Sequence, residues 1–237
     1  MALGGASASG GLVETFESYN STAEMQAVWA PVGGPGVLDT TRNSTPGGSK
    51  SFSHTPLDGT NSPGTQHIRT FAGETTAAGA PIIFEVSVYD DGSTSGSRMF
   101  AELRDSSGAG RILGLGVHNS TDDGDGIVDT YHLRQALGAG PTDQYLDLPG
   151  TKSVGWHDFR MVITPTEIRA SVDGNAERVV SFDSAGIIYS QMRLGGPSGV
   201  TSNGGVNFDD ISVAVPEPTS LALLALGAGG LMRRRRA

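Results

Sequence analysis

Hydrophobic and polar residues alternate along several segments of this chain, with the period of two that is typical of half-buried β-strands. At positions 81–89, for example, Phe84, Val86 and Val88 fall on one face of an extended chain, with polar side chains between them. The same period marks positions 111–117, 156–163 and 167–172, and further strands are expected at 13–19, 67–71, 98–104, 127–133, 178–182, 187–194 and 206–213.

Turn-forming residues separate these segments. The chain has 35 glycines and 12 prolines, and Asp173-Gly174-Asn175 is a tight-turn signal between two expected strands. Outside the C-terminal tail the sequence has no long 3.6-residue period and no internal repeat. The pattern therefore predicts an all-β fold, a two-sheet antiparallel sandwich, and 237 residues suit one such domain plus a tail.

Three patches resemble one family of sandwiches. Positions 155–159 (Gly-Trp-His-Asp-Phe), followed by 168–174, are similar to the Trp-His…Val-Asp-Gly hairpin of laminin-G-like, concanavalin-type jelly rolls. Positions 207–213 resemble the closing strand of that family, and 13–19 its opening strand, paired beside it. The resemblance implies a jelly roll over residues 12–214, with Trp156 in its core. We expect His157 to be structural.

The C-terminal tail has a different composition from the rest of the chain. Positions 215–219 contain two prolines, which restrict themselves and their predecessors and give a stiff, non-helical entry. Positions 220–232 carry no charge and suit a short hydrophobic helix. Those 13 residues would span about 20 Å as a helix, whereas a bilayer core is about 30 Å thick. The run is therefore short for a permanent anchor.

The order of elements in this tail resembles the PEP-CTERM sorting signal. The matching parts are the processing motif Pro216, Glu217 and Pro218, the apolar run 221–232, and the basic stop Arg233, Arg234, Arg235 and Arg236. The resemblance implies that an exosortase-type membrane protease cleaves near the motif after transient insertion in the inner membrane, and that the protein reaches the cell surface or extracellular matrix. The basic stop would stay cytoplasmic under the positive-inside rule.

The net charge of −9 conceals how acidic the body is. Without the four terminal arginines, 12 basic residues stand against 25 acidic ones, which gives −13. Such a body repels nucleic acid phosphates, so no nucleic acid partner is expected. The chain has no cysteine, which excludes disulfides, cysteine metal sites and a thiol nucleophile.

The first 11 residues are rich in Gly, Ala and Ser. Ala6-Ser7-Ala8 fits the small-x-small pattern before a signal-peptidase cut, but the basic start and apolar run of a full signal peptide are missing. Two interpretations stay open: a remnant of a longer signal peptide, and a flexible leader. We therefore divide the chain into 1–11, a sandwich over 12–214, and the sorting tail 215–237.

Calcium is the one metal that the sequence suggests, at two places. The first is a Gly-containing acidic stretch, since calcium favours several oxygen ligands on a tight turn; its carboxylates are Asp122, Asp123, Asp125 and Asp129. It is not an EF-hand, because Thr121 stands where the first Asp belongs and His132 where the final Glu belongs. The alternative is a polar hairpin tip.

The second candidate calcium site is the pair Asp209 and Asp210. The alternative there is that both carboxylates accept backbone hydrogen bonds at a strand edge. No other metal or organic cofactor is expected, because the five histidines have no metal-like spacing.

No catalytic motif is present. The Glu-x-Asp-x-x-Glu strand of jelly-roll glucanases, which supplies an acid and a nucleophile from one face, has no counterpart, because Glu85 and Glu102 lack the second Glu. No Gly-x-Ser-x-Gly elbow and no Walker-type loop occur. We therefore expect a protein that is not an enzyme.

Aromatic residues are the candidates for a sugar-binding surface: Trp29, Tyr89, Tyr131 and Tyr145, each with core placement as the alternative. Three functional hypotheses remain. The leading one is an exported structural or adhesive sandwich, the second a lectin-like module that binds extracellular polysaccharide, with or without calcium, and the third a polysaccharide-degrading enzyme with an unrecognised site.

Overall fold

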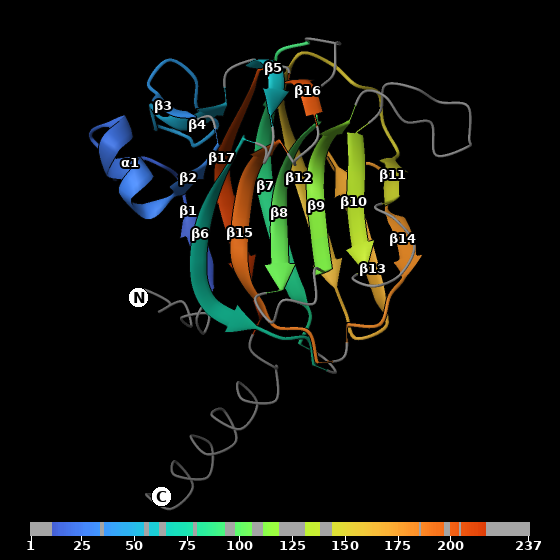
Figure 1. Ribbon diagram of the computed structural model, residues 1–237. Helices are drawn as coiled ribbons and strands as arrows, with labels where there is room; N and C mark the ends of the chain where they lie inside the picture. The colour runs from blue at the N-terminus through green and yellow to red at the C-terminus, as the bar shows by residue number, and fades with distance from the viewer. Residues whose placement is uncertain are drawn as a thin grey trace, which may run out of the picture.

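The computed structural model describes residues 11–33, 36–54, 57–61, 65–77, 80–92, 98–105, 111–118, 131–137, 144–184, 186–196, 200–203 and 205–216. Over these ranges the chain forms two large antiparallel sheets that pack face to face, with a small two-stranded sheet at one end (Figure 1). The predicted all-β, two-sheet antiparallel sandwich is therefore confirmed.

The first large sheet, sheet A, has the order β14-β13-β12-β7-β17-β4-β3, with β1 also paired to β17. Its strands are β1 (Leu12–Glu14), β3 (Val37–Asp39), β4 (Ser51–His54), β7 (Ile82–Asp90), β12 (Gly155–Ile163), β13 (Glu167–Val172), β14 (Arg178–Ser181) and β17 (Val206–Ala214).

The second large sheet, sheet B, has the order β11-β10-β9-β8-β15-β6-β2. Its strands are β2 (Ala30–Val32), β6 (Thr65–Glu74), β8 (Arg98–Asp105), β9 (Arg111–His118), β10 (Tyr131–Leu137), β11 (Gln144–Leu148) and β15 (Tyr189–Gly196). β5 (Leu57–Asn61) and β16 (Val200–Asn203) form the small sheet, and α1 (Thr22–Val28) lies beside β2 and β3 (Figure 1).

Alternation decides which side chains enter the core between the sheets. In β12, Phe159, Met161 and Ile163 are buried in the hydrophobic cluster between the sheets, which we call the core cluster, whereas Arg160 and Val162 between them lie on the outer face of sheet A. Leu115 of β9 and Leu133 of β10 enter the same cluster from sheet B. Burial of apolar surface on these facing sides holds the two sheets together.

The turn after β13 matches the tight-turn prediction. Asp173 and Gly174 have φ angles of 52° and 67°, the two positive values that a type I′ turn requires. The Asn175 backbone N–H donates to the Val172 carbonyl at 2.9 Å and closes the turn. The turn fixes the register of the chain from β13 into β14.

The opening segment differs from the strand expected at 13–19. Only β1 is extended, and it pairs with β17 as predicted, but Phe16 has a φ of 59° that ends the strand. The chain then enters α1, which the sequence did not predict because seven residues are too few to show a helical period. Ser21 caps this helix by accepting a hydrogen bond from the Glu24 N–H at 3.2 Å.

Most of the other expected strands are present, with shifted ends. Of positions 127–133, only the part from Tyr131 onward is described, and it opens β10. Six strands were not predicted, and most are short pieces at the margins: β2, β3, β4, β5, β11 and β16.

Of the sorting tail, the structure describes only Val215 and Pro216. β17 ends at Ala214, Val215 packs against the core cluster, and Pro216 is exposed. Glu217, Pro218, the expected hydrophobic helix and Arg233 to Arg236 lie outside the described residues, as do Asp122, Asp123, Asp125 and Asp129. In the described part of the chain, no helix has the length and apolar character needed to cross a membrane.

Candidate functional site

A row of polar side chains crosses the outer face of sheet B. Strand alternation turns Leu103, Leu115 and Leu133 inward, so the residues beside them face outward. The strand register aligns five of these across neighbouring strands, and we call them the charged row: Tyr145 of β11, Arg134 of β10, Gly114 of β9, Glu102 of β8 and Arg193 of β15.

Gly114 lets the two charged neighbours meet. A Cβ at this position would lie 3.1 Å from Glu102 Cγ and 3.4 Å from Arg134 Cβ. With no side chain between them, the Arg134 guanidinium reaches across β9 and forms an ion pair with Glu102. Glycine in a central strand weakens the strand, so the close approach is the physical reason for it here.

Glu102 is completely buried and ionised. Burial alone would raise the pKa of Glu102, but the charges of Arg134 and Arg104 outweigh it and hold the pKa below its usual value. Arg104 Nη2 lies 2.5 Å from Glu102 Oε2, and Gln66 donates to the same oxygen at 3.1 Å. The carboxylate therefore has three hydrogen-bonding neighbours.

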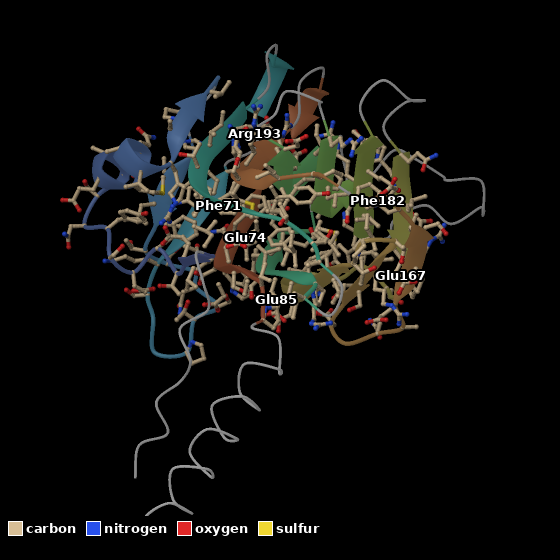
Figure 2. The ribbon with its side chains drawn as sticks, turned by 90° about the horizontal axis from the view of Figure 1, so that it is seen from below. Phe71, Glu74, Glu85, Glu167, Phe182 and Arg193 are labelled. Atoms are coloured by element: carbon tan, nitrogen blue, oxygen red, sulfur yellow. The ribbon has the colours of Figure 1, made fainter. Side chains whose placement is uncertain are left out.

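The arginines outnumber the carboxylate that they surround. Arg193 donates to Gln191 at 2.6 Å and to Gln66 at 3.3 Å, and burial together with the charge of Arg104 lowers the pKa of Arg193. Three arginines thus lie around the single carboxylate of Glu102. Figure 2 shows the labelled Arg193 on the sheet B side of the sandwich and Glu85 on the opposite side.

Aromatic rings stand beside the charged row. His118 and Tyr145 have ring centroids 4.1 Å apart, Phe100 and Tyr145 5.8 Å, and the Arg134 guanidinium lies 5.8 Å from the Tyr145 ring. We call Phe100, His118 and Tyr145 the ring cluster. His132 Nε2 lies 2.7 Å from Asp147 Oδ1, next to this cluster. Phe100 and His118 are fully buried and Tyr145 is half-buried, so of the ring cluster only Tyr145 is open to a ligand from outside.

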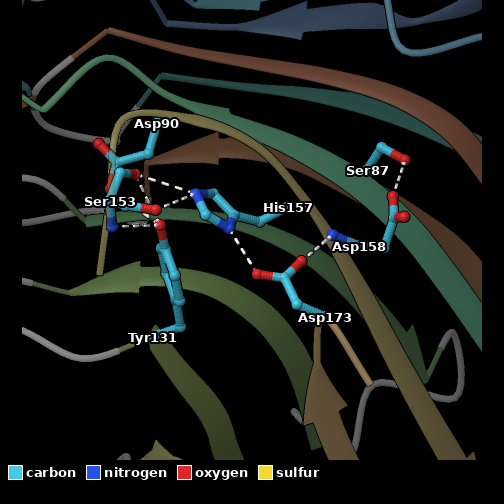
Figure 3. A network of polar contacts seen from close by, with 7 residues as sticks. All are labelled: Ser87, Asp90, Tyr131, Ser153, His157, Asp158 and Asp173. Carbon is cyan, nitrogen blue, oxygen red and sulfur yellow. Dashed lines mark hydrogen bonds and ion pairs between the residues drawn. The ribbon is translucent and has the colours of Figure 1, made fainter. Parts of the chain in front are cut away.

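A second polar network joins the start of β12 to the turn after β13 (Figure 3). His157 Nδ1 lies 2.7 Å from Asp173 Oδ2, and Asp173 Oδ1 accepts from the Asp158 N–H at 2.9 Å. On the other side of the ring, Tyr131 donates to the Ser153 carbonyl at 3.0 Å. This network fastens the hairpin to β10 across the sandwich.

His157 lies between Ser153 and Asp173, as the histidine of a serine hydrolase triad lies between its serine and its aspartate. The distances do not support that catalytic role. His157 Nε2 lies 3.4 Å from Ser153 Oγ and only 2.9 Å from the Ser153 carbonyl oxygen. A general base must offer Nε2 as an acceptor to the serine hydroxyl. Here the nearer partner of Nε2 is a carbonyl oxygen, which can only accept, so the contact of the ring with Ser153 holds the loop in place, as expected of a structural histidine.

Asp209 and Asp210 bind a loop of the chain itself. Asp209 is fully buried and accepts from the backbone N–H groups of Ser44 and Thr45 at 2.8 and 3.2 Å, and burial raises its pKa. Asp210 accepts from the hydroxyls of Ser44 and Thr45 at 2.8 and 2.6 Å. Asp209 thus accepts backbone hydrogen bonds, as in the alternative to calcium, whereas the donors to Asp210 are hydroxyls.

Calcium binding itself stays a prediction. Within the described ranges, no group of three or more His, Asp or Glu side chains is placed to hold a metal ion. The first candidate loop, with Asp122, Asp123, Asp125 and Asp129, falls outside those ranges.

The aromatic candidates for a sugar-binding surface differ in burial. Trp29 and Tyr131 are buried in the core cluster, whereas Tyr89 and Tyr145 lie on outer faces and are half-buried. Trp156, which the family resemblance placed in the core, is also half-buried on an outer face, because His157 beside it takes the inward position. The core tryptophan is Trp29, so the expectation for Trp156 was wrong.

Comparisons with known proteins identify a sorting motif in the tail and structures that share the fold. A family model described as the PEP-CTERM protein-sorting motif matches residues 214–236. Comparison with curated protein sequences gave no match.

Solved structures resemble the whole sandwich at low sequence identity. The globular domain of T. cruzi calreticulin has a TM-score of 0.56 at 14% identity, with 94% of each chain covered. A carbohydrate esterase from the Shiga toxin-encoding bacteriophage phi24B has a TM-score of 0.54 at 12% identity, with 87% of this chain and 98% of that chain covered. The cellulose induced protein Cip1 has 0.53 at 17%, with 86% and 96% covered.

These likenesses show the fold alone, which is that of jelly-roll sandwich proteins. The tail match is independent of them, because it rests on sequence at residues 214–236. The chain is therefore a jelly-roll sandwich that carries a PEP-CTERM protein-sorting motif, which implies an exported protein at the cell surface, processed by an exosortase membrane protease.

Proposed function

We propose that the sandwich is a non-catalytic adhesive module that binds extracellular polysaccharide through the outer face of sheet B. The observation that carries the proposal is the group of half-buried side chains Arg104, Arg193 and Tyr145 on this face, beside the buried, ionised Glu102. Convergent polar groups beside aromatic rings are the usual make-up of a ligand site. Pyranose sugars offer both hydroxyls for such groups and a C–H face for a ring.

The energetics of the charged row favour a binding role over a purely structural one. A buried ion pair usually adds little to stability, because desolvation offsets the attraction. Charged networks with shifted pKa values are therefore candidates for functional sites. With three arginines around one glutamate, the expected ligand carries carboxylate or sulfate groups, which guanidinium groups bind in a planar, paired geometry.

The structural neighbours and the sorting motif give this proposal a setting. One neighbour is by name a carbohydrate esterase, and the tail implies delivery to the cell surface. We also propose that the jelly roll is of the laminin-G-like subtype, which the Trp-His hairpin of β12 and β13 supports.

The binding test uses the full-length purified chain on an array of neutral, sulfated and uronic polysaccharides, with and without a calcium chelator. Tyr145→Ala and Arg193→Gln are expected to weaken binding of the acidic polymers by about tenfold, while Val179→Ala, an exposed change on sheet A, leaves it unchanged. Loss of binding on chelation would support the calcium-dependent form. No binding by the wild-type protein on any acidic polymer would refute the proposal.

We propose for the tail that positions 220–232 insert transiently in the inner membrane and are released by cleavage near Pro216, Glu217 and Pro218. The short apolar run before four arginines supports this. Mass spectrometry of the native C-terminus tests it, and an intact end at Ala237 on the surface-located protein would contradict it.

A polysaccharide-degrading enzyme is the competing function. The contact of His157 Nε2 with a carbonyl oxygen argues against a hydrolase centre at Ser153. Release of reducing ends from matrix polymers measures this alternative directly, and activity that Ser153→Ala abolishes would replace our proposal.

A further inference from the structure

Trp156 and Tyr89 form an aromatic pair on the outer face of sheet A. They are directly opposite each other on β12 and β7, with ring centroids 5.5 Å apart at an interplanar angle of 70°. The Arg42 guanidinium lies 4.5 Å from the Tyr89 ring centroid, so it covers one side of that ring. Both rings are half-buried although they lie on an outer face.

A pocket adjoins this aromatic pair. Its volume is about 380 Å³, and its lining includes Ser87 of β7 and Asp158 of β12, each the next outward residue after Tyr89 and Trp156 along its strand. Ligand pockets in proteins usually hold about 300–1,000 Å³, so this one is large enough for a sugar unit. Rings and pocket thus form one continuous surface.

The polar lining of the pocket is mostly acidic. Glu85, Asp158 and Asp210 line it against one cation, Arg160, which lies 3.2 Å from Glu85. Asp158 accepts a hydrogen bond from Ser87 at 2.7 Å, which leaves its second oxygen for another donor. The site therefore favours a ligand with donors and positive charge, the reverse of the charged row on sheet B.

We infer that this pocket and the aromatic pair bind an amino-sugar unit of a polysaccharide with free amino groups. The C–H face of the sugar stacks on Trp156, and its ammonium and hydroxyl groups donate to Asp158 and Glu85. Uronic acid chains are repelled by the same carboxylates. This site lies on the opposite side of the sandwich from Arg193, as Figure 2 shows by the label of Glu85, and it acts independently of sheet B.

The chain offers an internal reporter for the test. It has two tryptophans, and Trp29 is fully buried in the core, so a fluorescence change on ligand addition comes from Trp156. The probes are a glucosamine hexasaccharide, its fully N-acetylated form and a galacturonic acid hexasaccharide. We expect a saturable fluorescence change with the first, at least tenfold weaker binding of the second, and none of the third.

Variants then locate the binding by calorimetry on the full chain. Trp156→Ala and the shape-preserving Asp158→Asn are each expected to weaken glucosamine hexasaccharide binding about tenfold. Tyr145→Ala, on the sheet B face, and Val179→Ala, on sheet A away from the pocket, should leave it unchanged. Near-UV circular dichroism checks that each variant is folded.

Three results would overturn the inference: no binding of the glucosamine hexasaccharide, a Trp156 fluorescence response to the galacturonic acid hexasaccharide that equals or exceeds the response to the glucosamine hexasaccharide, or wild-type affinity in a folded Asp158→Asn variant. Loss of acidic-polymer binding by Tyr145→Ala does not bear on it, so failure at sheet B and failure at sheet A are separately visible.

Discussion

His67 links the stability of the sandwich to pH. It lies on β6 with its ring 4.7 Å from the ring of Phe52 at 65°, and the ring of His54 is 6.3 Å away. His67 is fully buried, and neither ring nitrogen has a hydrogen-bond partner in the described part of the chain. Burial, with a contribution from the charge of His54, lowers the pKa of His67 from 6.5 to about 4.

The direction of the pH effect follows from this lowered pKa. Between about pH 4 and 6.5 the unfolded chain binds a proton at His67 that the folded chain does not, so acidification favours unfolding. The stability that depends on a neutral His67 is fully present above the pKa of the unfolded chain and is lost as the pH falls through and below it. The total loss from His67 is about 3 kcal/mol, of which about 2 kcal/mol falls between pH 7 and pH 5.

The variant His67→Phe isolates this effect. Phenylalanine keeps a ring against Phe52 and His54 but binds no proton. Urea unfolding at pH 7, 6 and 5 gives the free energy of unfolding of both proteins. We expect the variant to gain about 2 kcal/mol relative to wild type on going from pH 7 to pH 5, whatever its offset at pH 7.

Phe52→Leu is the matched control, because it changes the same contact and removes no titrating group. Its difference from wild type should be the same at all three pH values. Parallel pH curves for wild type and His67→Phe would refute the reasoning, since His67 would then bind its proton equally well in the folded state.

Three further changes test the packing of the polar groups. Glu102→Gln leaves Arg134 and Arg104 without their anion and should lower the free energy of unfolding by about 3 kcal/mol or more in urea; a change under about 1 kcal/mol would contradict it. Gly114→Ala should separate Glu102 from Arg134 and weaken polysaccharide binding, and unchanged affinity would contradict that role. Glu14→Gln, at a carboxylate that binds Arg69 and other donors, should cost about 1–3 kcal/mol in the same urea assay, with exposed Val13→Ala near zero.

The sandwich was predictable because its central strands repeat with a period of two over eight or nine residues, as β7 and β12 do. The short strands had no such length to show a pattern: β3 has three residues and β4 has four. For α1 the available signal was its cap, since Ser21 and Glu24 have the spacing of a capping box.

The charged row was not predictable from spacing along the chain. Glu102, Gly114 and Arg134 come from three strands, and only the register of β8, β9 and β10 aligns them. The sequence indicated Glu102 only as part of an incomplete glucanase motif. The prediction for Trp156 was wrong for a related reason. Neighbouring residues of a strand face opposite sides, and the family pattern did not determine whether Trp156 or His157 faces the core.

The position of β17 determines how the sorting motif and the sandwich affect each other. β17 pairs with β7 on one side and with β4 and β1 on the other, so it lies inside sheet A. The motif begins at residue 214, the last residue of this strand, and Val215 is the last described residue that packs on the core. Cleavage after Pro216 therefore removes no described core contact, and both outer faces of the sandwich keep their residues through processing. A cut before Val215, by contrast, would expose part of the core, so we expect the processed protein to retain Val215.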